Sequence, residues 1–260
     1  MARRWAAGRN IDRGARVNGR LRALLRLFAV QGTWNYERML GVGMGYAAEP
    51  LLEDLKAVDP VRHGEAVVRS TEFFNCNPNL AGVALGATAR AEYEAVPGAQ
   101  IVRLRTALCS PLGALGDQLF WAGLVPALVG LAVLALVLGA GWWAVAGFLL
   151  VYNAIRLWTG HWSLRIGMEN GMRVGAAIGS SWLPRAIEWV GPPAGFALGA
   201  TLPVVSTWYL GEFGWAAVTG TAGVAVAGVA LTRWFGPGLS SVRFALIAMV
   251  LLLLFRRVGL

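Results

Sequence analysis

Residues 118 to 155 of the chain contain no Asp, Glu, Lys or Arg. Within this segment, Leu119 to Leu138 is rich in Leu, Val and Ala and has the roughly 20 residues that a helix needs to cross the hydrocarbon core of a bilayer. Gly139 to Trp143 predicts a turn followed by an interfacial aromatic anchor, after which Ala144 to Trp158 is long enough to return. The segment therefore predicts a transmembrane helical hairpin.

The composition extends this prediction to most of the chain, because 57% of the residues are hydrophobic and only 14% are charged. Further spans are expected at Gly191 to Gly211 and Phe213 to Thr232, with a shorter one at Val242 to Phe255. Three prolines, at positions 192, 193 and 203, are expected to interrupt the first of these. We predict an all-α, polytopic integral membrane protein with broken or re-entrant helices.

The N-terminus is strongly basic. Residues 1 to 26 contain eight Arg against one acid, Asp12, so this part carries +7 of the net charge of +9. A basic arm binds either nucleic acid or the anionic cytoplasmic face of a membrane, and on so apolar a chain the second is favoured. Apart from Trp5 the arm lacks the aromatic residues of single-strand binders, so no nucleic-acid partner is expected. We predict a basic, amphipathic, cytoplasmic or interfacial arm at residues 1–27 that contacts membrane lipid, and a membrane-embedded domain at 28–260.

An eight-residue sequence recurs in the chain with seven identities. Ala81 to Thr88 reads AGVALGAT and Ala194 to Thr201 reads AGFALGAT, and an Asn-x-x-Arg precedes each copy, at Asn35 and at Asn153. An inverted repeat of the kind found in transporters explains the recurrence, with halves at 28–117 and 118–260. Chance in a chain rich in Ala, Gly and Leu explains it equally well.

Two segments in the N-terminal half are apolar but short, Phe28 to Ala48 and Phe73 to Ala89, and both contain polar side chains. On a helix, Gln31, Asn35 and Arg38 would share one face, and Trp34 and Glu37 the adjacent one. Amide and carboxylate groups bind sugar hydroxyls, and an aromatic ring supports the apolar face of a sugar. These residues therefore predict a sugar site. The alternative is that Glu37 and Arg38 pair with each other or with a partner subunit.

Other familiar chemistries are not indicated. Gly41 to Gly45 has the spacing G-x-G-x-G without a preceding strand, so it predicts close packing or a hinge and not a nucleotide site. The two histidines, His63 and His161, have no ligand partners at metal spacing, and Cys76 and Cys109 stand in apolar or small-residue surroundings typical of packing. We predict no metal, no cofactor and no catalytic residue in this chain.

One acid stands at the beginning of the uncharged segment. Pro111, Gly113 and Gly116 precede Asp117, which predicts a helix that begins at Asp117, where the helix dipole favours an anion. Asp117 is then a simple helix cap. The alternative is a functional role, because an acid at or within the membrane is rarely kept without a partner or a task.

Three ordered motifs connect these features. They are Gln31 to Met39 (QGTWNYERM), Glu72 to Pro78 (EFFNCNP) and Pro111 to Trp121 (PLGALGDQLFW). On these motifs the chain resembles the IID membrane subunit of the mannose/fructose/sorbose class of bacterial sugar phosphotransferase systems. The chain departs from the pattern of that family at Ser70, where His is frequent, at Cys76, where Thr is usual, and near Arg105, where Lys is common. The acidic pair that follows the second motif is reduced to Glu92 and Glu94.

The resemblance implies a multi-pass permease subunit in the bacterial inner membrane that pairs with a IIC subunit and carries a hexose or amino-hexose. Soluble IIA and IIB proteins would supply the phosphate, and the assembly would be a hetero-oligomer such as a trimer of IIC–IID pairs. The residues that we expect to bind the sugar are Trp34, Asn35, Glu37, Arg38, Asn75, Asn77 and Asp117. The rival hypothesis is a membrane-anchored regulatory or scaffolding subunit that moves no sugar.

Overall fold

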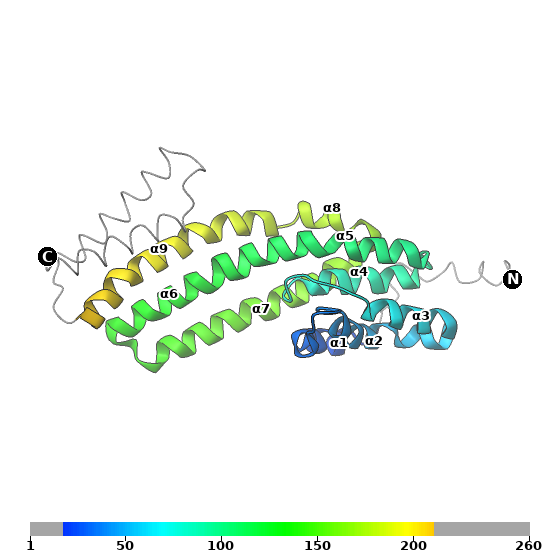
Figure 1. Ribbon diagram of the computed structural model, residues 1–260, viewed down its shortest axis with the longest axis horizontal. Coiled ribbons are helices and arrows are strands. Elements are labelled where there is room, and N and C mark those ends of the chain that lie inside the picture. The colour runs from blue at the N-terminus through cyan, green and yellow to red at the C-terminus, as the bar shows by residue number, and fades with distance from the viewer. Residues whose placement is uncertain (1–17, 211–260) are drawn as a thin grey trace. The chain divides into compact units, whose positions relative to one another are not determined.

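The computed structural model describes residues 18–210, and in this range it is built from helices and short connections without a named strand, as Figure 1 shows. The all-α prediction is confirmed for this part of the chain. The spans expected at Phe213 to Thr232 and Val242 to Phe255, and the arm before residue 18, lie outside the described residues. The elements are α1 (Arg20–Leu27), η2 (Val30–Thr33), α2 (Gly41–Val58), α3 (Pro60–Thr71), α4 (Ala81–Tyr93), α5 (Gly98–Gly116), η3 (Asp117–Leu124), α6 (Val125–Ala135), η4 (Leu136–Ala140), α7 (Trp142–Asn170), η5 (Gly171–Arg173), α8 (Val174–Gly179) and α9 (Leu183–Leu210).

The described residues form two compact units. The first comprises residues 18–124 and 150–190, and the second residues 125–149 and 191–210. The first unit holds α1 to α5, and the motifs singled out in the sequence lie in it. The domain boundaries expected from the sequence, at residue 28 and between residues 117 and 118, remain predictions.

Glycines bring α4 into backbone contact with α7 in the centre of the first unit. A Cβ atom at Gly86 would lie 2.5 Å from the carbonyl oxygen of Leu164, and one at Gly167 would lie 2.3 Å from that of Val83. Small residues permit such an approach, which is a common way of packing helices in membranes. Any larger side chain at these positions would force the two helices apart.

The glycine-rich start of α2 serves the same purpose, as the sequence predicts. A Cβ at Gly41 would lie 2.2 Å from the carbonyl oxygen of Glu72, and one at Gly43 would lie 2.2 Å from that of Val30. The segments on either side of α2 therefore rest directly on its first turn. This packing confirms that Gly41 to Gly45 is a contact surface.

The predicted helix start at Asp117 is wrong. Pro111 lies inside α5, and the chain continues from α5 into a π-helical segment, η3, whose first residue is Asp117. A π-helical turn shifts the hydrogen-bond register by one residue, so it can absorb an irregularity without ending the helix. The breaks expected at the prolines 192, 193 and 203 are also absent, because α9 runs through all three. Helices tolerate proline where neighbouring groups satisfy the freed backbone carbonyls.

The helical hairpin expected after residue 118 is present. Gly98–Ala140 is the one helix among the described residues that is long and apolar enough to cross a membrane, judged by length and composition, and 17% of its most apolar stretch is buried. Gly139 (φ 89°) and Gly141 (φ 55°) form the turn, and α7 begins at Trp142. Trp142 and Trp143 stack with ring centroids 3.7 Å apart and are both exposed. A second crossing along α7 remains a prediction.

The two copies of the recurring octamer are both helical but differ in their local packing. The first copy begins α4, where Gly82 would place a Cβ 2.3 Å from the Ser163 hydroxyl oxygen. The second lies inside α9, where a Cβ at Gly195 would meet nothing within 4 Å. The inverted repeat remains a prediction.

Candidate functional site

The first motif forms a tight hairpin between η2 and α2, and the helix expected over residues 31 to 38 is not formed. Gln31 lies in the short η2, and the backbone then turns so that the Met39 N–H donates to the Asn35 carbonyl (2.8 Å). The Asn35 side chain accepts from the N–H groups of Glu37 (3.1 Å) and Arg38 (2.8 Å). Asn competes in this way with helical hydrogen bonds, which explains why the helical pattern failed here.

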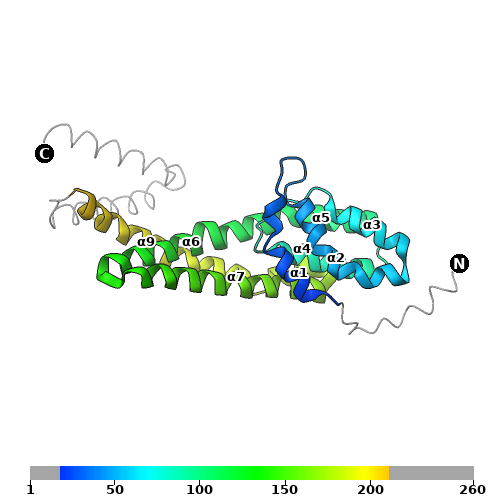
Figure 2. The same ribbon diagram turned by 90° about the horizontal axis from the view of Figure 1, so that it is seen from below.

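Two aromatic rings stand on this hairpin. Trp34 and Tyr36 meet edge to face with ring centroids 4.8 Å apart, and their side chains are 46% and 85% exposed. Figure 2 shows the dark-blue connection between α1 and α2 projecting from the helices around it. Aromatic groups are thus presented to the surroundings instead of filling the core.

The second motif pairs with the hairpin through Phe74. The Leu40 N–H donates to the Phe74 carbonyl (2.9 Å), and the Phe74 N–H donates to the Arg38 carbonyl (3.2 Å). The Phe74 ring is fully buried and anchors this pairing, while the next residue, Asn75, is exposed. Residues from the first two motifs are therefore held side by side on one surface.

The third motif joins the second through Asn77 and Asp117. The Asn77 amide donates to Oδ1 of Asp117 (2.9 Å), and Asn77 is almost fully buried, whereas Asp117 is exposed. Oδ1 of Asn77 accepts from the backbone N–H of Asn79 (3.0 Å) and from its side chain (3.2 Å). A Cβ at Gly116 would lie 2.2 Å from that of Asn77, so the glycine of the motif is required for the pair to form. Asp117 therefore orients a loop and does not cap a helix.

Arg105 supports the second motif from the interior of the first unit. In the sequence, Arg105 stood out only as a position near which the family commonly has Lys. Its side chain is 4% exposed, donates to the Glu72 carbonyl (2.8 Å) and lies over the Phe74 ring at 4.9 Å. Its Nε is buried without a hydrogen-bond partner in the described part of the chain. The α5 sequence holds two arginines, Arg103 and Arg105, and the apolar neighbours of Arg105 were the signal that could have pointed to it.

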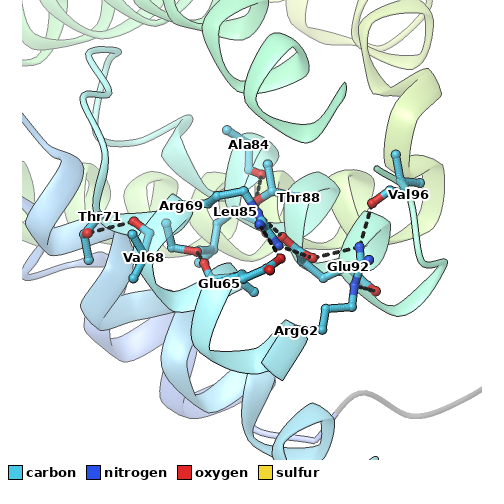
Figure 3. A network of polar contacts seen from close by, with 12 residues as sticks. Arg62, Glu65, Val68, Arg69, Thr71, Ala84, Leu85, Thr88, Glu92 and Val96 are labelled. Carbon is cyan, nitrogen blue, oxygen red and sulfur yellow. Dashed lines mark hydrogen bonds and ion pairs between the residues drawn. The ribbon is translucent and has the colours of Figure 1, made fainter. Parts of the chain in front are cut away.

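A buried ion cluster, which we did not identify from the sequence, ties α3 to α4. The side chain of Glu92 is only 4% exposed. Its carboxylate accepts a hydrogen bond from Nε of Arg69 (2.9 Å) and forms an ion pair with Arg62 (2.9 Å), as Figure 3 shows. Burial by itself lowers the pKa of the Arg69 guanidinium, but hydrogen bonds and charge attraction from Glu92 and Glu65 outweigh it and raise that pKa. The spacing of Arg62 and Arg69, seven residues apart on one helix face, was the sequence signal.

Beside this cluster lies a cavity of about 10 Å³, lined in part by Ser70, Thr88, Glu92 and Arg105. Such a volume suits about one water molecule, whereas small-molecule sites measure about 300–1,000 Å³. A hexose does not fit there. The surface where the three motifs meet is the candidate site, because backbone pairing at Phe74 and the Asn77–Asp117 hydrogen bond bring them together.

Metal ligation finds no support among residues 18–210, where no three His, Cys, Asp or Glu side chains gather as ligands. Cys76 is buried, and desolvation raises the pKa of its thiol, so it stays protonated and packs as a small hydrophobe. The predicted absence of a metal or cofactor remains a prediction for the whole chain.

The first motif contacts the second, and the second contacts the third. A comparison with known protein families identifies the family to which a chain with these motifs belongs. The family described as "PTS system mannose/fructose/sorbose family IID component" matches residues 18–200. The chain belongs to this IID family. Its membership covers both units of the described structure and the residues of all three motifs.

Individual relatives support the assignment. The chain is 29% identical over 196 residues to the mannose-specific EIID component of the phosphotransferase system of Escherichia coli K12, covering 71% of this chain and 65% of the relative. It is 31% identical over 185 residues to the fructose permease IID component of Bacillus subtilis, covering 68% and 64%. The chain thus spans about 65% of the length of these curated relatives.

Solved structures resemble the fold as well. A structure titled as a membrane protein matches with a TM-score of 0.60 and 26% identity, covering 70% of this chain and 68% of the other. A cryo-EM structure of the mannose transporter ManYZ with microcin E492 matches with a TM-score of 0.52 and 27% identity, at the same coverage. This IID family member is therefore a membrane protein of the sugar phosphotransferase system.

Proposed function

We propose that this chain is a multi-pass permease subunit of the bacterial inner membrane that, with a IIC partner, binds and carries a hexose or amino-hexose. Soluble IIA and IIB proteins deliver the phosphate. The names of the relatives support the sugar class, since they are mannose-, fructose- and sorbose-specific components. The partner is supported by the similarity to a structure of the ManYZ transporter.

The observation that carries the proposal is the surface formed where the hairpin pairs with Phe74. Its two paired segments carry the exposed Trp34 ring and the exposed side chains of Glu37, Arg38 and Asn75, and these three polar side chains make no hydrogen bond or ion pair within residues 18–210. Charged and amide groups that are not used by the fold are free to bind sugar hydroxyls, and the ring offers a face for stacking.

The remaining candidates divide by what their side chains already do. The amides of Asn35 and Asn77 are committed to the hairpin turn and to Asp117, so we assign them to positioning the site. Asp117 uses Oδ1 for Asn77 and is exposed, which leaves its other oxygen available to a hydroxyl group. It also begins the π-helical segment, a feature frequent at functional sites.

The surface is open on one side. Tyr36 is 85% exposed, and Phe73 next to the pairing is 54% exposed. Sugar sites bury most of their ligand, so the IIC partner is assigned the opposite wall. In this proposal the described chain supplies one wall of the site and the IIC partner supplies the other.

The direct test replaces Glu37, because its carboxylate supports nothing else in the described fold. In the chain purified together with its IIC partner, Glu37→Gln is expected to weaken hexose binding about 10- to 100-fold, the cost of losing a charged hydrogen bond, with an unchanged melting temperature. Glu188→Gln, at an exposed site on α9, is the matched control. Sugar binding and uptake that are indifferent to Glu37→Gln and to Asn75→Ala would favour the scaffolding hypothesis instead.

A further inference from the structure

Two faces of α1 are occupied by the protein itself. Ala23 and Leu27 are buried, and Leu24, partly buried, packs against the same core. Arg22 and Arg26 form ion pairs with Glu53 and Glu49 of α2. The helix is therefore fixed in place, with a defined orientation.

The third face of α1 is apolar and uncovered. Leu21 and Leu25, four residues apart and so on one face, are 70% and 59% exposed. Arg20 is exposed beside them and makes no ion pair within the described residues. A short helix with one leucine face and arginines along its flanks has the composition of helices that lie in a membrane interface.

The contacts of Phe28, the residue after α1, indicate where α1 lies relative to the hydrocarbon core of the bilayer. Its carbonyl accepts from Arg156 of α7 (3.3 Å), its ring lies under the same guanidinium at 5.3 Å, and a Cβ at Gly160 would lie 3.1 Å from the ring. Arg156 is the first charge after the uncharged residues 118–155. The C-terminal end of α1 therefore lies where α7 leaves the segment suited to hydrocarbon.

The direction of α1 agrees with this depth. Figure 2 shows α1 lying across the direction of α5, with which it shares the first unit. An amphipathic helix that lies across the end of a spanning helix is placed to lie in the plane of the interface. Its exposed leucines would then face acyl chains and not water.

We propose that α1 is an interfacial anchor that binds an anionic bilayer surface, with Leu21 and Leu25 at the boundary between headgroups and acyl chains. Charge complementarity selects the lipid: the sequence before α1 adds five Arg and one Asp to the exposed Arg20. Each basic residue near an anionic membrane contributes about 1 kcal/mol, equal to about fivefold in binding. The excess of arginine places this face on the cytoplasmic side. The inference rests on the membrane location of the family and is independent of the sugar site.

The test uses the full chain in lipid nanodiscs. Leu25→Cys, made in a Cys76→Ala/Cys109→Ala background, carries an environment-sensitive fluorophore, and lipids with a shallow spin label quench it. Val58→Cys, at an 80% exposed position on the end of α2, is the matched control. We expect blue-shifted, strongly quenched fluorescence at residue 25 in discs containing phosphatidylglycerol, less in pure phosphatidylcholine or high salt, and none at residue 58.

Several outcomes contradict the proposal. If the label at residue 25 is as accessible to water as the label at residue 58, α1 is not a membrane anchor. If quenching is equal with and without anionic lipid, the anchor does not require anionic lipid. A label that is shielded from water but not quenched by lipid would show that protein covers the face. Leu21→Cys provides a second position, and the melting temperature of each labelled chain confirms its folding. Hexose binding is measured in parallel, so a failure here leaves the proposed function standing.

Discussion

At the scale of single residues, the candidate site separates side chains that build the surface from side chains that are free to use it. The side-chain oxygen of Asn35 accepts hydrogen bonds from two backbone N–H groups, and the side-chain amide of Asn77 donates to Asp117. The side chains of Glu37 and Arg38 make no hydrogen bond or ion pair within the described chain. Both kinds were proposed as sugar ligands from the sequence, because residue type indicates what a group can bind but not whether the fold already uses it.

The pair formed by Asn77 and Asp117 can be exchanged to separate these roles. Asn77→Asp alone places two carboxylates at the present distance of 2.9 Å and is expected to lower the stability by about 1–3 kcal/mol. Combining it with Asp117→Asn restores a donor facing an acceptor and is expected to recover the melting temperature. Hexose binding should stay impaired in the exchanged pair, because the charge has left position 117.

Full recovery of hexose binding in the exchanged pair would contradict contact between the Asp117 charge and the sugar, and would leave Asp117 with a positioning role alone. The matched control is the single change Asp117→Asn, whose carbonyl can still accept from Asn77. Thermal unfolding in detergent and equilibrium sugar binding are the two measurements.

At the scale of elements, helices formed by long uncharged, apolar segments were predictable from the sequence, and the irregular connections between helices were not. The hairpin after residue 118 follows from a long uncharged segment and a Gly-Ala-Gly turn, and the structure has both. The helix expected through Asn35 failed because a side chain captured two backbone N–H groups, which periodicity does not register. The break expected at Asp117 failed because a proline and a π-helical turn were accommodated in one continuous helix.

The packing of α4 against α7 predicts opposite effects for two glycine substitutions. Gly86→Ala would bring a Cβ within 2.5 Å of the Leu164 carbonyl oxygen, and is expected to lower the melting temperature clearly by forcing the helices apart. Gly64→Ala, inside α3 with nothing within 4 Å of the added Cβ, is expected to raise stability by about 0.4–1 kcal/mol. Equal melting temperatures for the two variants would contradict the contact between α4 and α7.

The ion cluster between α3 and α4 predicts a further contrast. Glu92→Gln removes the buried carboxylate shared by Arg62 and Arg69, whose side chains are 16% and 14% exposed, and is expected to cost about 3–5 kcal/mol although Arg69 keeps its exposed partner Glu65. Glu94→Gln removes an exposed pair with Arg90 and is expected to cost about 0.3–0.5 kcal/mol. Thermal or denaturant unfolding of both variants checks the difference, and a mild effect at position 92 would mean that the cluster is solvated.

At the scale of the whole molecule, the order of the three motifs in the sequence identified the family, while their meeting in space required the structure. Phe74 joins the first motif to the second, and Asn77 joins the second to the third, through contacts between residues up to 40 positions apart. Arg105 and the cluster at Glu92 support this meeting from the interior. Residue patterns do not reveal such long-range pairings, so the sequence could name candidate residues but not the geometry that brings the motifs together, and the role of these residues in sugar binding stays a prediction.

The central claim is that the surface of the three motifs forms half of a sugar site that a IIC partner completes. Equilibrium binding of a panel of hexoses and amino-hexoses to this chain, to the IIC partner and to the two purified together tests it most directly. We expect saturable binding of at least one sugar by the pair, weakened by Glu37→Gln, and little binding by either subunit alone. Binding by the IIC subunit alone with the affinity of the pair would contradict the claim.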